Sequence, residues 1–293
     1  MKRIFEDRRT ALLLLAPALL VYTLVMLVPV VWSLGYTLLD GNAVAGFQYT
    51  GFDNFARLAD DPKVWQAFTF TLKYAVVITT GQVLLGYVLA VFYVFVLRRS
   101  GSVVRTLTFF PVVLPTVAVA LLFQKMFEIA PQNGLVNSVL NALGMGSVDW
   151  FGSAGTAFFV LALMDIWRSM GFYAVLLYTG LLDIPEEVLE SARMDGASGW
   201  RLVRQIVLPL SLPVLVSSLI FSINGTLKVF DSVLALTNGG PGLGTTPLTL
   251  YMFQTSFSFG DYGYGSTIAL LLTLVCLVVT LAVFRSARRD VNA

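Results

Sequence analysis

Long apolar runs alternate with short polar segments along this chain. About 20 consecutive apolar residues are needed to cross the hydrocarbon core of a bilayer as a helix, and six stretches reach that length. They lie at residues 11–39, 71–97, 103–127, 156–182, 206–236 and 266–284. The pattern therefore predicts an all-α membrane protein with six transmembrane helices.

Prolines interrupt several of the runs. They are Pro29, Pro111, Pro115, Pro209 and Pro213. Because proline frees a backbone carbonyl inside a helix, neighbouring helices or water must satisfy that carbonyl at membrane depth. We expect kinked spans, as in helical bundles that move.

Lysine and arginine cluster beside the runs on one predicted side of the membrane. Thirteen of the nineteen basic residues fall there: Lys2, Arg3, Arg8, Arg9, Arg98, Arg99, Arg105, Arg193, Arg201, Arg204, Arg285, Arg288 and Arg289. The opposite loops hold Arg57, Lys63 and Lys73, and Lys125, Arg168 and Lys228 fall at or within membrane depth. Since flanking positive charge stays inside, both termini and residues 190–209 are predicted to be cytoplasmic.

Composition agrees with an integral membrane protein. The chain is 57% hydrophobic and 12% charged, against about 25% charged in soluble domains. Its first apolar run is too long for a signal-peptide core, so we interpret it as a retained span. We expect an N-terminal helix with its outer loop at 1–66, a membrane domain at 67–285 that contains a cytoplasmic loop at 184–209, and a cytoplasmic tail at 286–293. Segments 40–70 and 128–155 form a small outer cap.

The sequence lacks residues that metal, nucleotide-binding and catalytic sites usually contain. The sequence contains no histidine, its single cysteine is Cys276, and no G-x-x-x-x-G-K-[ST] phosphate-binding motif occurs. We find no nucleophile–base pair and no metal-ligand cluster. A net charge of +2 does not argue for nucleic acid. We predict no catalytic residue, no metal site and no cofactor in this chain.

A polar insert, "ESARMDGASGWRLVRQIVLP", separates the fourth and fifth runs at residues 190–209. Pro185, Glu186 and Glu187 suit the start of a helix, and Gly196 suits its end. A second short helix, "ASGWRLVRQ", then leads into the fifth span. One interpretation is an amphipathic connector at the headgroups, with its arginines meeting anionic lipid. The other is a low-profile knob that fits a groove in a soluble partner.

The spacing of this insert resembles that of one family of proteins. Inner-membrane permeases of ATP-binding-cassette importers carry E-A-A, three residues, G, nine residues and then I-x-L-P in a cytoplasmic loop. Here the sequence reads Glu190-Ser191-Ala192, then Gly196, then Ile206-Val207-Leu208-Pro209. Ser191 in place of the first alanine is a small-for-small departure that keeps the low profile.

A second segment resembles the carbohydrate-uptake branch of that family, whose permeases carry T-x-G-G-P followed by T. The matching residues are Thr237, Gly239, Gly240, Pro241 and either Thr245 or Thr246. Taken alone, "NGGPG" is equally typical of an outer turn with no special task. Together with the insert, it favours the sugar-importer interpretation.

The resemblance implies one transmembrane subunit of a bacterial inner-membrane importer. The insert would be a coupling helix that docks on a cytoplasmic ATPase through Glu190, Ala192 and Gly196, with Asp195 and Ala197 flanking the turn. The implied partners are a second, homologous permease, two cytoplasmic subunits that bind ATP and Mg²⁺, and an extracellular solute-binding protein. The cargo would be a di- or oligosaccharide.

Ionisable residues inside the spans mark either packing pairs or the solute path, because charge at membrane depth is costly. Asp165 and Arg168 are three residues apart on the fourth run, and Lys228 and Asp231 repeat that spacing on the fifth, with Asn224 one turn earlier. Trp167 or Tyr173 would offer a ring to a sugar. The four charges cancel, which mildly favours a neutral solute.

Two other functions stay open at this stage. The same machinery could import a glycerophosphate, a polyol or another small polar solute, although a phosphate would favour a net positive path. A stand-alone channel or membrane enzyme would have no need of an ATPase-docking loop, so the insert argues against it.

Overall fold

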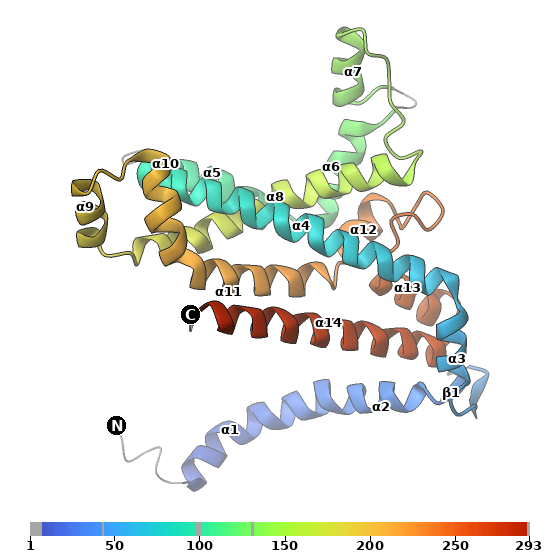
Figure 1. The fold of residues 1–293 in the computed structure, drawn as a ribbon. Coiled ribbons are helices and arrows are strands. Elements are labelled where there is room, and N and C mark those ends of the chain that lie inside the picture. The colour runs from blue at the N-terminus through green and yellow to red at the C-terminus, as the bar shows by residue number, and fades with distance from the viewer. Residues whose placement is uncertain (1–7, 43, 98–100, 130–131, 292–293) are drawn as a thin grey trace. The chain divides into compact units, whose positions relative to one another are not determined.

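The computed structural model describes residues 8–42, 44–97, 101–129 and 132–291, and most of them are helical (Figure 1). The chain forms two compact units, Met1–Pro62 with Tyr251–Thr273 and Lys63–Leu250 with Leu274–Ala293. Helix α14 (Tyr262–Val291) contributes to both units. Lys2, Arg3, Arg98 and Arg99, which we used to predict topology, lie outside the described residues.

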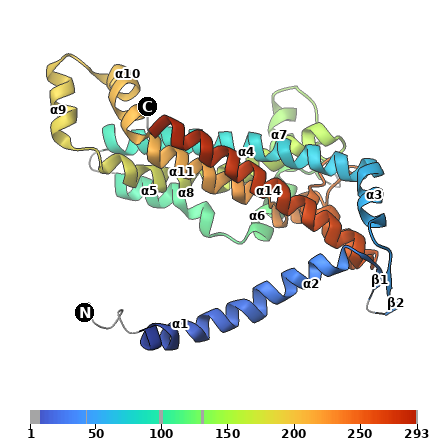
Figure 2. The same cartoon turned by 60° about the horizontal axis from the view of Figure 1, so that its bottom comes forward.

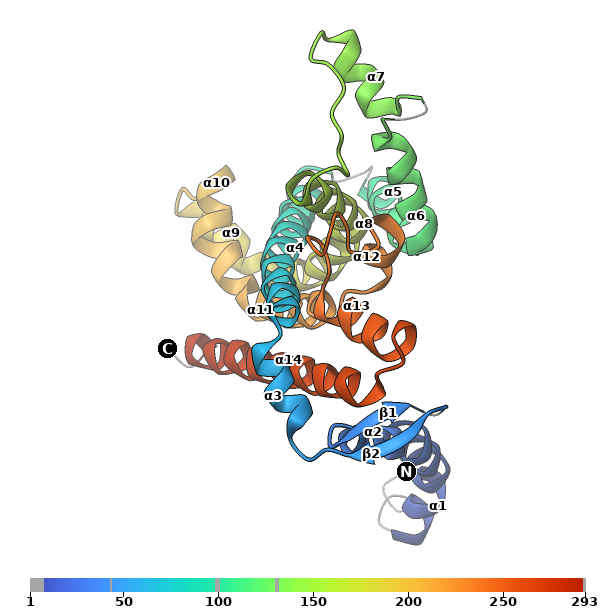
Figure 3. The same cartoon turned by 90° about the vertical axis from the view of Figure 1, so that its right-hand side faces the viewer.

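The first unit opens with a long apolar helix. It consists of α1 (Arg8–Tyr22), the π-helical turn η2 (Thr23–Leu27) and α2 (Val28–Tyr36). Its most apolar window has no side chain buried against the rest of the chain. An antiparallel hairpin of β1 (Leu39–Asn42) and β2 (Gly46–Tyr49) follows beside α2 (Figure 3).

A polar network ties helix α3 (Asp53–Asp60) to the beginning of α14 within this unit. The Arg57 guanidinium lies 2.6 Å from the Asp261 carboxylate. Asp61 accepts hydrogen bonds from the hydroxyls of Tyr251 and Tyr264, at 2.8 and 2.7 Å. Burial and the hydrogen bond to Asp61 raise the pKa of Tyr251, so its hydroxyl stays protonated as the donor.

The second unit is a bundle of long helices. These are α4 (Pro62–Phe95), α5 (Gly101–Val113), α6 (Thr116–Phe127), α8 (Ala154–Leu182) and α11 (Leu208–Thr226). Figure 3 views α4 and α8 nearly end-on. The shorter elements are α7 (Leu135–Ala142), α9 (Glu186–Met194), α10 (Gly199–Leu202), η3 (Val203–Val207), α12 (Asp231–Leu236), α13 (Leu248–Phe253) and η4 (Gln254–Ser258), of which η4 belongs to the first unit.

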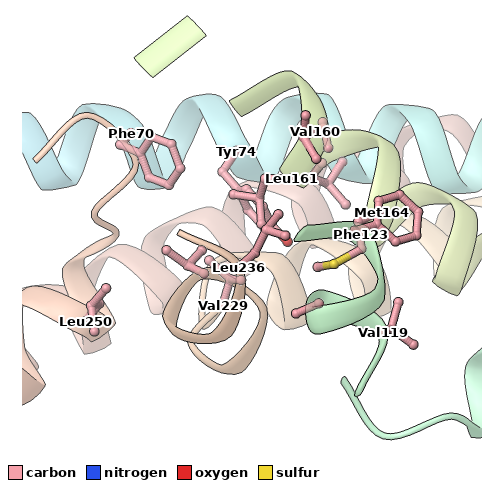
Figure 4. Packing of buried hydrophobic residues seen from close by; sticks show 14 of the residues in the cluster. Phe70, Tyr74, Val119, Phe123, Val160, Leu161, Met164, Val229, Leu236 and Leu250 are labelled. Carbon is pink, nitrogen blue, oxygen red and sulfur yellow. The ribbon is translucent and has the colours of Figure 1, made fainter. Parts of the chain in front are cut away.

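Apolar side chains from α4, α6, α8, α12 and α13 form the main core of the bundle (Figure 4). Phe70 from α4, Phe123 from α6 and Leu161 from α8 meet Leu236 from α12. A second cluster joins α4 and α8 to the α9–α11 region. Glycines let helices approach closely, as is typical of membrane bundles: a Cβ at Gly171 would overlap the backbone of α5 at Thr108.

Five of the six predicted spans are long apolar helices in the structure, at Leu12–Tyr36, Pro62–Phe95, Ala154–Leu182, Gly199–Thr226 and Tyr262–Arg285. The third span is broken: α5 and α6 meet at a bend of 95°. Proline disfavours helical geometry at the residue before it, and Pro115 directly precedes α6. The 286–293 tail is helical as far as Val291.

The fifth predicted span, 206–236, is wrong at its C-terminal end. Helix α11 stops at Thr226, and the chain turns through hydrogen bonds from Lys228 N to Gly225 O and from Val229 N to Thr226 O. Helix α12 then begins separately at Asp231. Asn224, Lys228 and Asp231 therefore do not share one helix face, because a helical face requires an unbroken helix.

The two predicted outer segments have secondary structure of their own. Residues 40–70 contain most of the hairpin, α3 and the first turns of α4, and residues 128–155 contain α7. Buried Asn137 holds the second segment together by donating to the carbonyls of Glu128 and Val148 and accepting from Trp150 Nε1. Which end of the bundle faces the cytoplasm stays a prediction.

Candidate functional site

A cavity of about 250 Å³ opens inside the second unit. Its walls come from α4, the start of α6, α8, the end of α11 and the connection from α11 to α12. Both broken spans reach it, since Thr116 follows the α5–α6 bend and Lys228 lies in the α11–α12 turn. Broken helices at membrane depth are tolerated where they line a cavity.

The charged lining residues are two acids and two bases. Asp165 is only 3% exposed, and its Oδ2 accepts a 2.6 Å hydrogen bond from the hydroxyl of Tyr74 on α4. Its Oδ1 lies 3.9 Å from Arg168 Nε. A buried carboxylate needs such partners, because removing a charge from water without pairing it is costly. Lys228 and Asp231 also line the cavity and are exposed.

Arg168 contributes a donor that the protein leaves unused. Within the described part of the chain, its Nε is buried and has no hydrogen-bond partner, since Asp165 lies beyond hydrogen-bonding distance. A buried donor without a partner costs free energy. A hydroxyl or an acid group entering the cavity would remove that cost.

Aromatic rings give the cavity apolar surface beside these polar groups. Tyr74, Tyr173 and Phe230 all line it. Gly86 places α4 directly against Tyr173, because a Cβ at Gly86 would lie 2.7 Å from the Cβ of Tyr173. Rings next to donors and acceptors suit a sugar, which has apolar ring faces and many hydroxyls.

A ladder of polar side chains joins α4 and α11 along one wall. Gln82 Nε2 donates to Ser222 Oγ at 2.5 Å, and Ser222 Oγ donates to Thr79 Oγ1 at 3.0 Å. The hydroxyls of Thr79 and Thr226 lie 3.1 Å apart. Sequence reasoning missed this ladder. The sequence did contain a signal for it, because polar residues inside apolar runs commonly form hydrogen bonds between membrane helices.

Five of the six residues predicted to line a path surround this one cavity: Asp165, Arg168, Tyr173, Lys228 and Asp231. Their role in transport stays a prediction. Asn224 lies elsewhere, donating to Ile220 O and accepting from Thr280 Oγ1 of α14. Trp167 packs on Phe123 in the apolar core, with ring centroids 5.8 Å apart.

The α9–α10 loop projects beyond the ends of α8 and α11 (Figure 2). Pro185 is the cap residue just before α9. The helix ends as predicted at Gly196, whose φ is +86°. Gly196 N donates to Arg193 O and Ala197 N donates to Ala192 O, the paired bonds of a Schellman motif. The second helix is continuous with α11, because α10 and η3 lead into it without a break.

The residues predicted for coupling divide into two groups. Ala192 and Ala197 are both 8% exposed and pack into the second core cluster, which fixes the turn against the bundle. Glu190, Asp195 and Gly196 are exposed. No atom lies within 4 Å of a Cβ built at Gly196, so its outer face is open to a partner.

The Gly-Gly-Pro segment is held by its threonines. Thr237 and Thr245 hydroxyls lie 2.8 Å apart, Thr245 donates to Gly240 O, and Thr246 donates to Gly239 O. Both Thr245 and Thr246, the two candidates for the last threonine of the motif, therefore hydrogen-bond to the Gly-Gly-Pro segment. Gln124 of α6 donates to the last two carbonyls of α12, Ala235 O and Leu236 O, and so fixes the helix that precedes this segment.

Comparison with known proteins identifies the family. The family described as the inner membrane component of binding-protein-dependent transport systems matches residues 82–289. The chain belongs to this family. It is therefore a transporter permease of the inner membrane. In the described part of the chain, five helices are long and apolar enough to cross a membrane, or six if the bent pair is one span.

Curated relatives match over nearly the whole chain. The sulfoquinovosyl glycerol transport system permease of Agrobacterium fabrum is 33% identical over 96% of this chain and 91% of its own length. The trehalose/maltose permease of Thermococcus litoralis is 30% identical, covering 97% and 95%. The lactose permease of Rhizobium radiobacter is 30% identical, covering 94% and 93%.

Solved structures match the fold. A chain of a bacterial ABC transporter involved in import of the acidic polysaccharide alginate superposes with a TM-score of 0.85, 22% identity, and coverage of 98% of this chain and 99% of that one. A second structure, of a bacterial alginate ABC transporter in complex with an alginate pentasaccharide-bound periplasmic protein, matches with a TM-score of 0.84 and 22% identity. The match covers 98% of this chain and 96% of that one. The all-α permease fold predicted from sequence is confirmed.

Proposed function

We propose that this permease forms half of the translocation path for a di- or oligosaccharide delivered by an extracellular solute-binding protein. The observation that carries the proposal is the cavity at the two helix breaks, which combines balanced charge, the unpartnered donor Arg168 Nε and aromatic rings. The names of three relatives, which concern sulfoquinovosyl glycerol, trehalose or maltose, and lactose, support a glycoside.

In this proposal, the α9–α10 loop couples transport to ATP hydrolysis. Glu190, Asp195 and the open face of Gly196 would contact a cytoplasmic ATPase, while Ala192 and Ala197 anchor the turn to the bundle. The partner set is a second permease, two ATP-binding subunits that hold ATP and Mg²⁺, and the binding protein. Hydrolysis would belong to those partner chains.

A second candidate cargo is a small solute with an anionic group, such as a glycerophosphate. Arg168 Nε without a hydrogen-bond partner among the described residues, and exposed Lys228, favour an acid group in the cavity. Asp165 and Asp231 oppose it, so the neutral glycoside is preferred.

Co-purification tests the proposal. The chain is tagged, extracted gently from native membranes, and its companions are identified by mass spectrometry. A second permease, an ATPase and a binding protein are expected, and isothermal titration of that binding protein with glycosides, polyols and glycerophosphates then identifies the cargo class. Recovery of the chain alone, under conditions that preserve a known importer, would contradict the proposal.

A further inference from the structure

An apolar groove of about 390 Å³ runs between α4 and the α10–α11 helix, on another surface of the second unit from the polar cavity. Thr80, Leu84, Val88 and Val91 form one side of the groove. They recur at helical spacing along α4. The other side extends from Leu219 to Trp200. The groove therefore follows the helix axes from within the bundle toward the α9–α10 loop.

The groove offers few groups to a polar ligand, since Thr80, Tyr87 and Trp200 are the lining residues that carry a polar side-chain atom. Tyr87 lines the floor, but its hydroxyl lies 3.0 Å from Ser211 Oγ and bonds there. Leu84 and Val88 are more than half exposed. Hydrocarbon is the chemistry that such a surface accepts.

The length of the groove matches one leaflet of a bilayer. Residues 80–91 of α4 cover ~17 Å at a rise of 1.5 Å per residue, close to the ~15 Å depth of one leaflet. One extended acyl chain can therefore lie along the whole groove.

The loop end of the groove carries the residues expected at a lipid headgroup. Trp200 is 76% exposed, and tryptophan is enriched at membrane interfaces. Arg201 and Arg204 lie in the same and the next turn, and Arg201 Nε donates to Gln205 Oε1. Neither arginine forms an ion pair with an acid among the described residues, so their positive charge is available to an anionic headgroup.

We propose that this groove is a phospholipid site, which binds one acyl chain of an anionic lipid from the leaflet beside the α9–α10 loop. Trp200 lies against the upper part of the chain, and Arg204 meets the headgroup. Because α10 and η3 lead directly into α11, a lipid bound here contacts the helix that carries the loop.

Quenching of Trp200 fluorescence tests the proposal. The tagged chain with its co-purified partners is reconstituted in phosphatidylcholine vesicles that contain a small fraction of either phosphatidylglycerol or phosphatidylcholine with brominated chains. The Trp200 contribution is the difference between the wild type and Trp200→Phe. We expect brominated phosphatidylglycerol to quench it at about fivefold lower fraction than brominated phosphatidylcholine.

Two variants and a control separate the headgroup from the groove. Arg204→Gln should remove the preference for phosphatidylglycerol, and Leu84→Phe with Val88→Phe should reduce quenching by both lipids. Val117→Phe with Leu121→Phe makes the same two kinds of change, four residues apart, at exposed positions of α6 and should change nothing. Equal quenching by both lipids in all variants would overturn the proposal. So would protection of Trp200 from both lipids, since another chain would then cover the groove.

Discussion

The turn at Gly196 is built from residues that follow one another in the chain, whereas the cavity at Asp165 draws its walls from five segments between residues 74 and 232. The turn closes through backbone bonds three to five residues apart. The cavity depends on contacts such as that between Tyr74 and Asp165, which are 91 residues apart.

This contrast determines where a substitution should act. A change at the exposed face of the loop alters a local conformation and leaves the bundle intact, because the side chains that anchor the loop, among them Ala192, Ala197 and Leu202, are other residues. A change in the cavity acts through packing and hydrogen bonds that several helices share. Substitutions in the loop and in the cavity should therefore differ in their effects on uptake and on stability.

The largest effect is expected from Gly196→Val. At φ +86° a β-branched residue is strained by roughly 1–3 kcal/mol, which disfavours the turn by about five- to 150-fold. Uptake of the labelled solute should fall accordingly while the amount of protein in the membrane stays unchanged on a quantitative blot.

Gly146→Val is the matched control for this change. Gly146 also has positive φ, +76°, and no atom lies within 4 Å of a Cβ built there, but it follows α7 and not α9. The backbone penalty is the same, so uptake close to wild type is expected. Equal loss in both variants would show that strain, and not the loop, causes the defect.

Asp165→Asn should reduce uptake by about tenfold, since hydrogen bonds to charged groups contribute about 1.5–3 kcal/mol. The asparagine oxygen can still accept from Tyr74, so the thermal unfolding midpoint in detergent should change little. A large loss of folded protein, with normal specific uptake of what remains, would make Asp165 a packing residue.

A smaller effect is expected from Tyr74→Phe, which deletes the hydroxyl that bonds Asp165. One buried hydrogen bond contributes about 1 kcal/mol, so uptake should fall by about fivefold. If Tyr74 and Asp165 act through one contact, Tyr74→Phe combined with Asp165→Ala, which removes that contact, should be no worse than Asp165→Ala alone. Additive losses in initial uptake rate would contradict a shared contact.

The smallest effect is expected from Asn224→Ala. Asn224 bonds Thr280 of α14 and lies outside the cavity lining. Hydrogen bonds between membrane helices average about 0.6 kcal/mol, so stability should fall slightly and uptake should change by less than about threefold. A tenfold loss of uptake would return Asn224 to the solute path.

The helices were largely predictable because apolar run length and turn residues are local signals. Gly196 with Glu186 and Glu187 defined α9 almost to the residue. The break after Thr226 was not predictable from the apolar run, because no proline or charge cluster ends α11. Backbone bonds from Lys228 and Val229 and the packing of α12 on α6 and α8 decide it.

The charged cavity residues were predictable as a group, since charge inside an apolar run is rare and usually faces a cavity. Asn224 lies outside the cavity lining because α11 ends at Thr226, whereas its grouping with Lys228 and Asp231 assumed an unbroken helix. The hydrogen-bonded ladder of Gln82, Ser222 and Thr79 was missed because the sequence does not indicate which residue of another helix an uncharged polar side chain will bond. Only the approach of α4 to α11 brings them together.

Whether the loop controls the cavity can be measured directly with one reporter thiol. Ser169 lines the cavity, and Cys276 is the only cysteine in the sequence, so Ser169→Cys in a Cys276→Ser background provides that thiol. Its labelling rate by a water-soluble maleimide is measured in the reconstituted transporter with and without ATP. We expect a rate that changes with ATP, and loss of that change when Gly196→Val is added. An ATP-dependent rate that persists with Gly196→Val would contradict control of the cavity by the loop.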